Sequence, residues 1–246
     1  MPTFVQFLLT GNAKSADPLA DSNKFLQGQI TANIHKIDKD FLPTAICNLK
    51  GRILFGIWLK RANNGFYIVL SEDLADDFIK HVKKYGAFSK IELSEKTEIF
   101  PTIIDNLPTF SNDKNLQNVS DWQNLSIATG NYWITKATSE LYQPQELRLH
   151  QRGGVDFDKG CYLGQEIIAR LWFKASPKAW LHRIFCQDLN QLSEKIGVVN
   201  HIQINHGFEA LVVARPDELH NITQNIPEVK ILTLPEALQQ SVARKS

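Results

Sequence analysis

The sequence is poor in cysteine, in net charge and in long apolar runs, and each shortage excludes a class of protein. Its three cysteines lie far apart, which fits neither a disulfide framework nor the paired ligand spacing of a zinc or cluster site. The 27 lysines and arginines nearly balance the 26 aspartates and glutamates, which argues against direct binding to nucleic acid. No apolar run approaches the ~20 residues of a membrane span, and the N-terminal segment lacks the pattern of a signal peptide. These absences predict a cytoplasmic protein with reduced thiols, no bound metal and no membrane partner.

Enough apolar material is present for a sizeable core, since 43% of the 246 residues are hydrophobic. Runs of strand character occur at residues 53–59, 66–70 and 87–93. Asn63-Asn64-Gly65 separates the first two runs and predicts a tight hairpin. Apolar residues recur at helical spacing from Leu74 to Tyr85, ahead of the third run. This order predicts an α+β layer with an antiparallel sheet.

Two later regions differ in character. Residues 94–121 are polar and contain two prolines, which predicts an exposed connection with little order. Short apolar stretches then recur at 179–185, 197–204, 208–214 and 230–234, separated by turn residues. This spacing predicts a small antiparallel sheet or barrel as a separate C-terminal unit.

The segment Lys159-Gly160-Cys161-Tyr162-Leu163-Gly164-Gln165-Glu166, called the signature loop below, concentrates the features of a reactive thiol. Lys159 lies two positions before the sulfur, and a helix over 164–170 would place the positive end of its dipole beside Cys161. Both effects stabilise a thiolate, and the flanking glycines leave room for a substrate or a partner backbone. The competing interpretation is a structural cysteine, because cysteine is among the most often buried residues.

The same loop matches K-G-C-[FY]-x-G-Q-E, the signature of the YgfZ family, at every fixed position. Phe25 to Thr31 resembles the family's F-L-Q-G-Q-x-T segment, and Tyr85 to Ile91 resembles its Y-x-x-F-S-K-V stretch. The matches run in order through about three quarters of the chain, which one chance motif would not do. The sequence is therefore similar to the YgfZ family, folate-binding relatives of the glycine-cleavage T-protein.

This resemblance implies a T-protein-like α+β fold with antiparallel-sheet domains and a small C-terminal β-barrel. Residues 1–175 would form the folate-binding region, with a shortened middle subdomain at about 48–118, and residues 176–246 would form the barrel. The implied cofactor is tetrahydrofolate or another folate. The implied function is that of an accessory protein for iron–sulfur cluster assembly or repair, and thereby for tRNA modification, with iron–sulfur client or assembly proteins as partners.

The resemblance also assigns residues. Cys161 and Lys159 would form the functional loop, and Trp122 would stack on the folate, although a core tryptophan is the alternative. Arg170 could pair with a folate carboxylate or serve as a solvated cation at a helix end.

Three further residues belong to the predicted folate site. Gln27 and Gln29 could hydrogen-bond the pterin edge or cap local backbone, and the sequence leaves both open. Glu166 is included through its place in the signature loop.

The pattern departs from the aminomethyltransferases of the T-protein type. Those enzymes carry an acidic segment where this chain has Asn48-Leu49-Lys50-Gly51-Arg52-Ile53. Without that carboxylate the proton chemistry of aminomethyl transfer lacks its base. This one-carbon transferase activity therefore ranks below the accessory function and is kept as the alternative. A cysteine hydrolase with His150 as base ranks below it, because nothing in the sequence places a histidine beside Cys161. The protein is therefore predicted not to be an enzyme of the usual kind.

Overall fold

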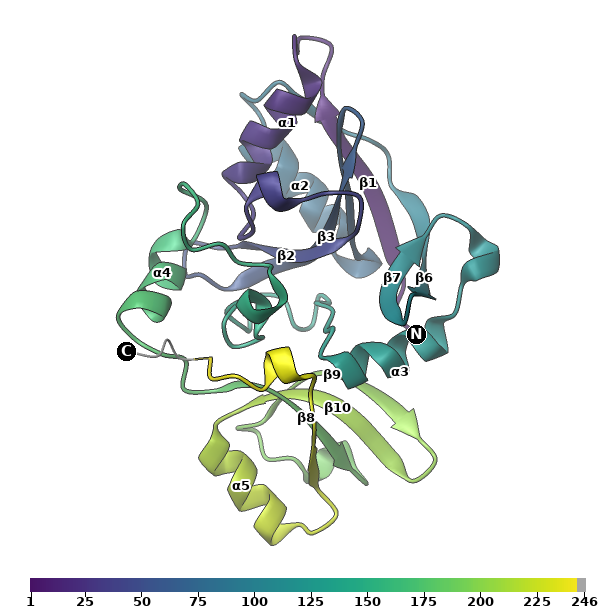
Figure 1. The fold of residues 1–246 in the computed structure, drawn as a ribbon, viewed down its shortest axis with the longest axis vertical. Helices are drawn as coiled ribbons and strands as arrows, with labels where there is room; N and C mark the ends of the chain where they lie inside the picture. The colour runs from purple at the N-terminus through teal and green to yellow at the C-terminus, as the bar shows by residue number, and fades with distance from the viewer. Residues whose placement is uncertain (243–246) are drawn as a thin grey trace.

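Two antiparallel sheets organise the chain in the computed structural model, which describes residues 1–242 (Figure 1). The larger sheet has the order β2-β3-β4-β1-β6-β7, and β5 also pairs with β1. Its strands are β1 (Phe4–Gly11), β2 (Leu42–Cys47), β3 (Ile53–Ala62), β4 (Gly65–Ser71), β5 (Ile91–Leu93), β6 (Thr97–Ile104) and β7 (Leu107–Ser111). The helices are α1 (Pro18–Gln27), α2 (Ala75–Tyr85), α3 (Val119–Thr129), α4 (Gln165–Phe173) and α5 (Pro216–Asn225). Mixed helices and antiparallel strands confirm the predicted α+β class.

The hairpin predicted around Asn63-Asn64-Gly65 is confirmed as the β3–β4 turn, with Ala62 paired to Gly65. A Cβ atom on Gly65 would lie 2.0 Å from the carbonyl oxygen of Leu9, so this close approach of β1 requires glycine. The helix predicted from Leu74 to Tyr85 is α2, and the backbone N–H of Gly86 caps it by donating to the carbonyl of Val82.

The prediction of a weakly ordered connection over 94–121 is wrong. Strands β6 and β7 form a hairpin there, and α3 begins at Val119. The turn uses Asp105 at φ 51° and Asn106 at φ 58°, two residue types that tolerate the left-handed region without a glycine to signal it. Pro108 sits on β7, the edge strand of the sheet, where a missing N–H costs no ladder hydrogen bond.

Side chains alternate between the two faces of the larger sheet, and both faces carry buried aromatic residues. Phe7 of β1 packs against Phe78 of α2 with ring centroids 5.5 Å apart. Phe4, which faces the other way, contacts Trp58 of β3 and Trp122 of α3 at 5.8 and 5.1 Å. Helices α1 and α2 are neighbours, since Gln29, just after α1, pairs with His81 of α2 at 2.9 Å.

The smaller sheet has the order β11-β8-β10-β9, all antiparallel. Its strands are β8 (Trp180–Cys186), β9 (Gly197–Ile204), β10 (Gly207–Ala214) and β11 (Lys230–Leu232), which confirms the four predicted stretches as strands. One face packs on α5 around Ile184 and Leu219, and the other joins the main core through Leu181 and Val213. A closed barrel is not confirmed, because β9 and β11 stay unpaired on their outer edges within residues 1–242.

No helix within 1–242 is long and apolar enough to cross a membrane. Nor do these residues bring together three or more His, Cys, Asp or Glu side chains that could hold a metal ion.

Candidate functional site

The signature loop lies directly against the segment 25–31, so two regions far apart in the sequence form one structural unit. The backbone N–H of Leu163 donates to the carbonyl of Gly28 at 3.2 Å. Before the loop, the N–H of Asp156 donates to the carbonyl of Thr31 at 2.9 Å, and the Thr31 hydroxyl donates to the carbonyl of Gly154 at 2.6 Å. Both segments that carry the resemblance are therefore parts of the same site.

Lys159 fastens the loop to the C-terminal end of α1. Its ammonium donates to the carbonyl oxygens of Gln27, Ile30 and Ala32 at 2.8, 2.7 and 2.9 Å, which uses all three of its protons. Helix-end carbonyls carry partial negative charge, so a cation there is favourable. The side chain is only 6% exposed, and this burial lowers the pKa of Lys159 to about 8. Lys159 thus anchors the loop to the protein, while the Cys161 side chain stays exposed to solvent.

Cys161 is exposed, unlike the other two thiols. Cys47 and Cys186 are buried, and burial raises the pKa of both. A Cβ atom on Gly160 would meet nothing within 4 Å, so the space beside Cys161 is open. Helix α4 begins at Gln165, as the sequence predicts. The thiol therefore lies four residues before a helix start, on a loop that another molecule can reach.

The base of the loop is held by a close backbone contact. Gly164 has φ 81°, and a Cβ atom there would lie 2.4 Å from the carbonyl oxygen of Asn48. Asn48 itself closes a turn, because its Oδ1 accepts from the N–H groups of Lys50 and Arg52 at 2.9 and 3.0 Å. The segment that replaces the acidic motif of the aminomethyltransferases thus supports the signature loop.

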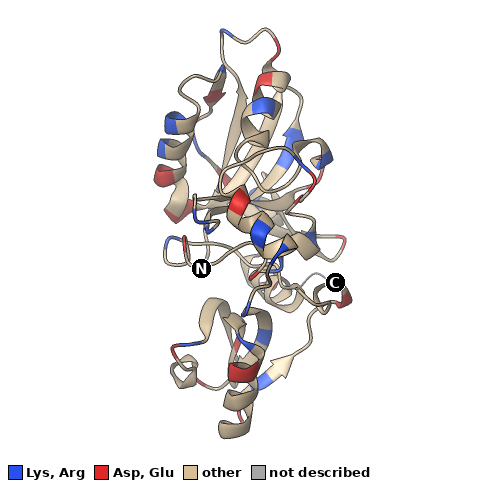
Figure 2. Cartoon of the chain, turned by 90° about the vertical axis from the view of Figure 1, so that its left-hand side faces the viewer, with Lys and Arg blue, Asp and Glu red and all other residues tan. Residues whose placement is uncertain are grey.

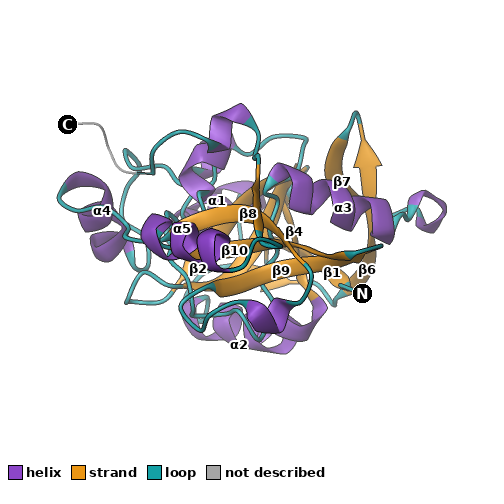
Figure 3. Ribbon diagram, turned by 90° about the horizontal axis from the view of Figure 1, so that it is seen from below, coloured by secondary structure: helices purple, strands orange, loops and turns teal. Residues whose placement is uncertain are grey.

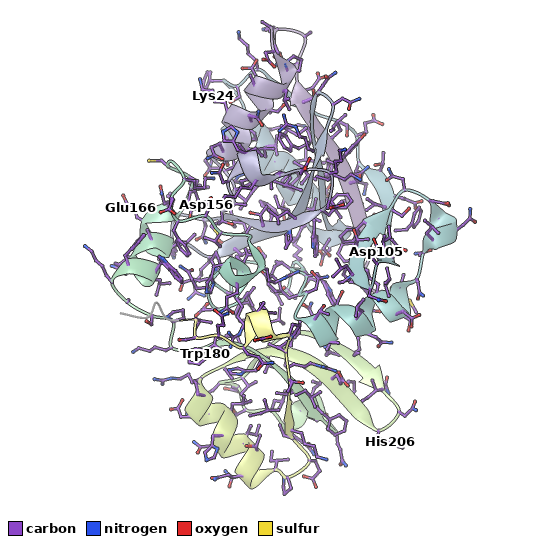
Figure 4. All side chains as sticks on the ribbon, viewed as in Figure 1. Lys24, Asp105, Asp156, Glu166, Trp180 and His206 are labelled. Carbon is purple, nitrogen blue, oxygen red and sulfur yellow. The ribbon has the colours of Figure 1, made fainter. Side chains whose placement is uncertain are left out.

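The structure does not gather the other sequence-predicted residues into one pocket. The Oε1 of Gln27 accepts from the N–H of Ile34 at 2.9 Å, and the Oε1 of Gln29 pairs with Nε2 of His81 at 2.9 Å. Glu166 and Arg170 are exposed on α4 (Figure 4 labels Glu166). Their binding roles stay predictions, and the glutamine amide oxygens already have protein partners.

Trp122 is fully buried among other rings. Its indole lies 5.6 Å from Phe110, 6.4 Å from Trp58 and 5.4 Å from Trp133, and its Nε1 has no hydrogen-bond partner among the described residues. Stacking of a folate on Trp122 stays a prediction, and it would require neighbouring rings to move. In this conformation Trp122 forms the layer behind Trp58 and Phe110.

In front of that layer lies a cleft of about 540 Å³, within the usual range for small-molecule sites. It opens between the ends of β2 and β3, the β6–β7 hairpin and the segment after α3. The cleft is lined by Lys39, Asp40, Phe41, Pro43, Trp58, Lys60, Ile104, Asp105, Leu107, Pro108, Thr109, Phe110, Thr129, Asn131 and Arg152. Asp105, at the hairpin turn, is labelled in Figure 4.

Aromatic rings and cations alternate along this cleft. Trp58 and Phe110 have centroids 5.0 Å apart, and Phe41 lies 5.7 Å from Phe110. The ammonium of Lys60 lies 5.5 Å from the centroid of the Phe41 ring. Phe41 is partly exposed beside the positive charge of Lys60, whereas Trp58 and Phe110 are each only 5% exposed and form the floor of the cleft.

Arg152 is a cleft cation with a buried nitrogen that lacks a hydrogen-bond partner among the described residues. Its Nη2 donates to Oδ1 of Asn131, and its guanidinium lies 5.5 Å from the centroid of the Tyr132 ring. Its Nη1 is buried without a hydrogen-bond partner among the described residues, and burial lowers the pKa of the guanidinium. A buried donor without an acceptor is costly, so this atom calls for an anionic or carbonyl partner.

The sequence prediction missed this cleft. Trp58 lies in the run 53–59 that was predicted as a strand, and Phe110 lies in the segment 94–121 that was predicted as a weakly ordered connection. No motif in the sequence singled out Arg152. The signature loop and the β6–β7 hairpin lie on opposite sides of the molecule in two perpendicular views (Figures 1 and 3).

Two curated proteins similar to this chain carry the same name. The "tRNA-modifying protein YgfZ" of Escherichia coli O127:H6 (strain E2348/69 / EPEC) is 25% identical over 292 aligned positions, which cover 90% of each chain. The protein of that name from Escherichia coli O157:H7 (strain EC4115 / EHEC) is 27% identical over 216 positions, 66% of each chain. The chain is similar to these YgfZ proteins. The resemblance read from the motifs is thereby confirmed, while no family model matches the chain.

A solved structure supports the fold predicted from that YgfZ resemblance. The glycine cleavage system aminomethyltransferase T from Bartonella henselae superimposes with a TM-score of 0.61 over 86% of this chain and 76% of that chain. The two sequences are 10% identical, so the likeness concerns the fold alone. The T-protein-like architecture is confirmed.

His150, the base considered for a cysteine hydrolase, lies in an aromatic setting. Its ring is 5.3 Å from Trp172 and 6.4 Å from Phe157, and both ring nitrogens are buried without hydrogen-bond partners among the described residues. Burial lowers the pKa of His150 to about 4. Nothing in this arrangement connects the imidazole with Cys161.

Proposed function

We propose that this protein binds a folate in the Trp58–Arg152 cleft and supports tRNA modification as an accessory to iron–sulfur proteins. The observation that carries the proposal is the buried, unpartnered Nη1 of Arg152 in a cleft walled by aromatic rings. The names of the similar proteins support the link to tRNA modification. The T-protein-like fold makes a folate the plausible ligand.

The cleft suits the chemistry of a folate. A pterin and an aminobenzoyl group are flat, and Phe41 offers ring surface for contact above the nearly buried rings of Trp58 and Phe110. The glutamate tail is anionic, and Arg152 and Lys60 can pair with its carboxylates. A bound tetrahydrofolate would supply one-carbon or redox chemistry through its pterin. The residues present therefore fit this group.

Cys161 and its loop form the second part of the proposed site. The thiol is exposed and the space beside Gly160 is open, so it can meet a protein partner. We assign the iron–sulfur client or assembly protein to this face. The folate cleft shares no lining residue with the signature loop, which predicts that the two features can be disabled separately.

The test is calorimetric titration of the intact protein with tetrahydrofolate, compared with Arg152→Gln and Lys60→Ala. Loss of one charge-assisted hydrogen bond should weaken binding about 10- to 100-fold in the Arg152 variant. Arg61→Ala is the matched control, because Arg61 is an exposed cation next to Lys60 that does not line the cleft. Cys161→Ser should bind folate like the intact protein.

Two outcomes would redirect the proposal. A loss of binding in Arg170→Ala with no change in Arg152→Gln would move the folate carboxylate to Arg170, one of the two roles that the sequence left open for that residue. No binding to any folate form would remove the cofactor and leave the thiol loop as the site of function. Formation of methylenetetrahydrofolate from an aminomethyl donor would favour the transferase alternative, which the turn at Asn48 argues against.

A further inference from the structure

A second surface, away from the folate cleft, combines exposed aromatic rings with unpaired lysines. It is formed by α1, the C-terminal end of α2 and the α2–β5 loop, and is called the Phe88 face below. Phe88 is fully exposed at 104% of its reference area, and Tyr85 is 38% exposed. Exposed aromatic rings beside cations present a surface on which a flat group can stack.

The lysines of the Phe88 face carry uncompensated charge. Lys24, Lys83, Lys84 and Lys90 are all exposed, and none forms an ion pair with residues 1–242. Figure 4 labels Lys24 on the outer side of α1, and Figure 2 shows blue bands on both upper helices. The near-zero net charge of the whole chain therefore hides a local positive patch, which is what short-range binding to a polyanion requires.

The surroundings hold this patch in place. The N–H of Asn12 donates to the carbonyl of Lys90 at 2.9 Å, which ties the β1–α1 loop to the α2–β5 loop. Tyr85 lies between two other groups: its centroid is 4.4 Å from that of His81, and the ammonium of Lys84 lies 5.1 Å from it. The ring of Tyr85 is therefore held by contacts with its neighbours.

A polar hollow of about 430 Å³ opens between these rings and α1. Besides Lys24, Lys90, Tyr85 and Phe88, it is lined by Asp21, Phe25, Gly28, Gln29 and Ser89. Asp21 accepts from the Ser15 hydroxyl through Oδ2, and its Oδ1 has no hydrogen-bond partner among the described residues. A free carboxylate oxygen among lysines repels phosphate but accepts a hydroxyl proton, and a ribose 2′-hydroxyl is such a donor.

We propose that the Phe88 face binds a single-stranded RNA segment, with a base stacked on Phe88 and the backbone phosphates on the lysines. Stacking platforms combined with flexible cations are the usual means of holding single strands without sequence preference. The size of the hollow allows a nucleotide to enter beside the stacked base. This inference concerns a surface separate from the folate cleft and does not depend on folate binding.

The test is fluorescence anisotropy with a short labelled single-stranded RNA and the full-length protein. About four phosphate contacts predict that log Kd rises with log salt at a slope of roughly 3, since each contact contributes about 0.7. Phe88→Ala should weaken binding about 5- to 100-fold. The double variant Lys84→Ala/Lys90→Ala should lower the slope by about 1.4.

Matched controls come from residues outside the Phe88 face, on β11 and in the segment between β7 and α3. Ile231→Ala removes another exposed apolar side chain, and Lys114→Ala/Lys230→Ala removes two other exposed lysines, so neither should change RNA binding. Salt-insensitive binding, or equal losses in the control variants, would overturn the proposal. Equal affinity for DNA of the same sequence would overturn the assignment to RNA. If a glutamate-rich peptide binds this face and RNA does not, the face serves an acidic protein instead.

Discussion

The ammonium of Lys159 lies 2.7 Å from the carbonyl oxygen of Ile30, across 129 positions of sequence. This contact, with those to Gln27 and Ala32, holds the signature loop on the end of α1. From the sequence, Lys159 was interpreted as a charge that activates the neighbouring thiol. In the structure its protons are all directed away from Cys161, so its effect on the thiol is one of position.

Replacing Lys159 by methionine should therefore loosen the loop. Three carbonyls lose their donor, while the burial cost of the ammonium disappears, and the net loss should be about 1–3 kcal/mol in the free energy of unfolding. Chemical denaturation measures this, and hydrogen exchange at the Leu163 amide should speed up as its bond to Gly28 opens more often. Lys36→Ala is the control, because the Lys36–Asp156 pair is 69% exposed at the lysine and should contribute under about 1 kcal/mol. Equal effects in both variants would contradict the anchor role.

A thiol titration should separate the three cysteines. Cys161 is exposed, whereas Cys47 and Cys186 are buried with raised pKa values, so one thiol of three should react with an aromatic disulfide reagent in the native protein. All three should react after unfolding. Cys161→Ser should abolish the native reaction, and Cys186→Ser should leave it unchanged. A native count of two or more would show that the buried cysteines become accessible.

Two glycines of the signature loop should respond differently to a methyl group. Gly164 has a positive φ and a Cβ there would lie 2.4 Å from the Asn48 carbonyl oxygen, so Gly164→Ala should lower the free energy of unfolding by at least about 2 kcal/mol. Gly160 has open space and no such φ, so Gly160→Ala should stay within about 0.5 kcal/mol. Thermal unfolding of both variants makes the comparison. If Gly160→Ala keeps full stability but impairs tRNA modification in cells, the added methyl group obstructs a partner, and the function requires that partner to come close to Cys161.

These two glycines also show how far the sequence reaches. The start of α4 was predictable because its signals are local: a glycine, then helix-forming residues, with the cysteine just ahead. The β6–β7 hairpin was not, because Asp105 and Asn106 adopt positive φ without a glycine. The folate cleft was missed for a different reason. Trp58, Phe110 and Arg152 meet only after the sheet has formed, and each alone has the character of a core or surface residue. Trp122 was singled out by resemblance, and burial among rings is a property that no local pattern reveals.

Acid should destabilise the protein through buried histidines, of which His81 is the clearest. Its side chain is 8% exposed, and burial lowers its pKa to about 4 from 6.5. Between these two values the unfolded chain binds a proton that the folded chain refuses, so stability falls as pH falls. The loss is about 1.4 kcal/mol per pH unit and ends below pH 4, where both states are protonated.

The variant His81→Gln removes this titration while retaining a donor for the Gln29 amide oxygen. Its free energy of unfolding should be measured by denaturation at pH values from 7 to 4.5. Plotted against pH, it should fall less steeply than that of the intact protein, by the amount that corresponds to about one proton. His206→Gln is the matched control, because that histidine is exposed in the β9–β10 turn (Figure 4). An unchanged slope in His81→Gln would mean that the imidazole is protonated in the folded state, and hence that the Gln29–His81 contact opens to water as pH falls.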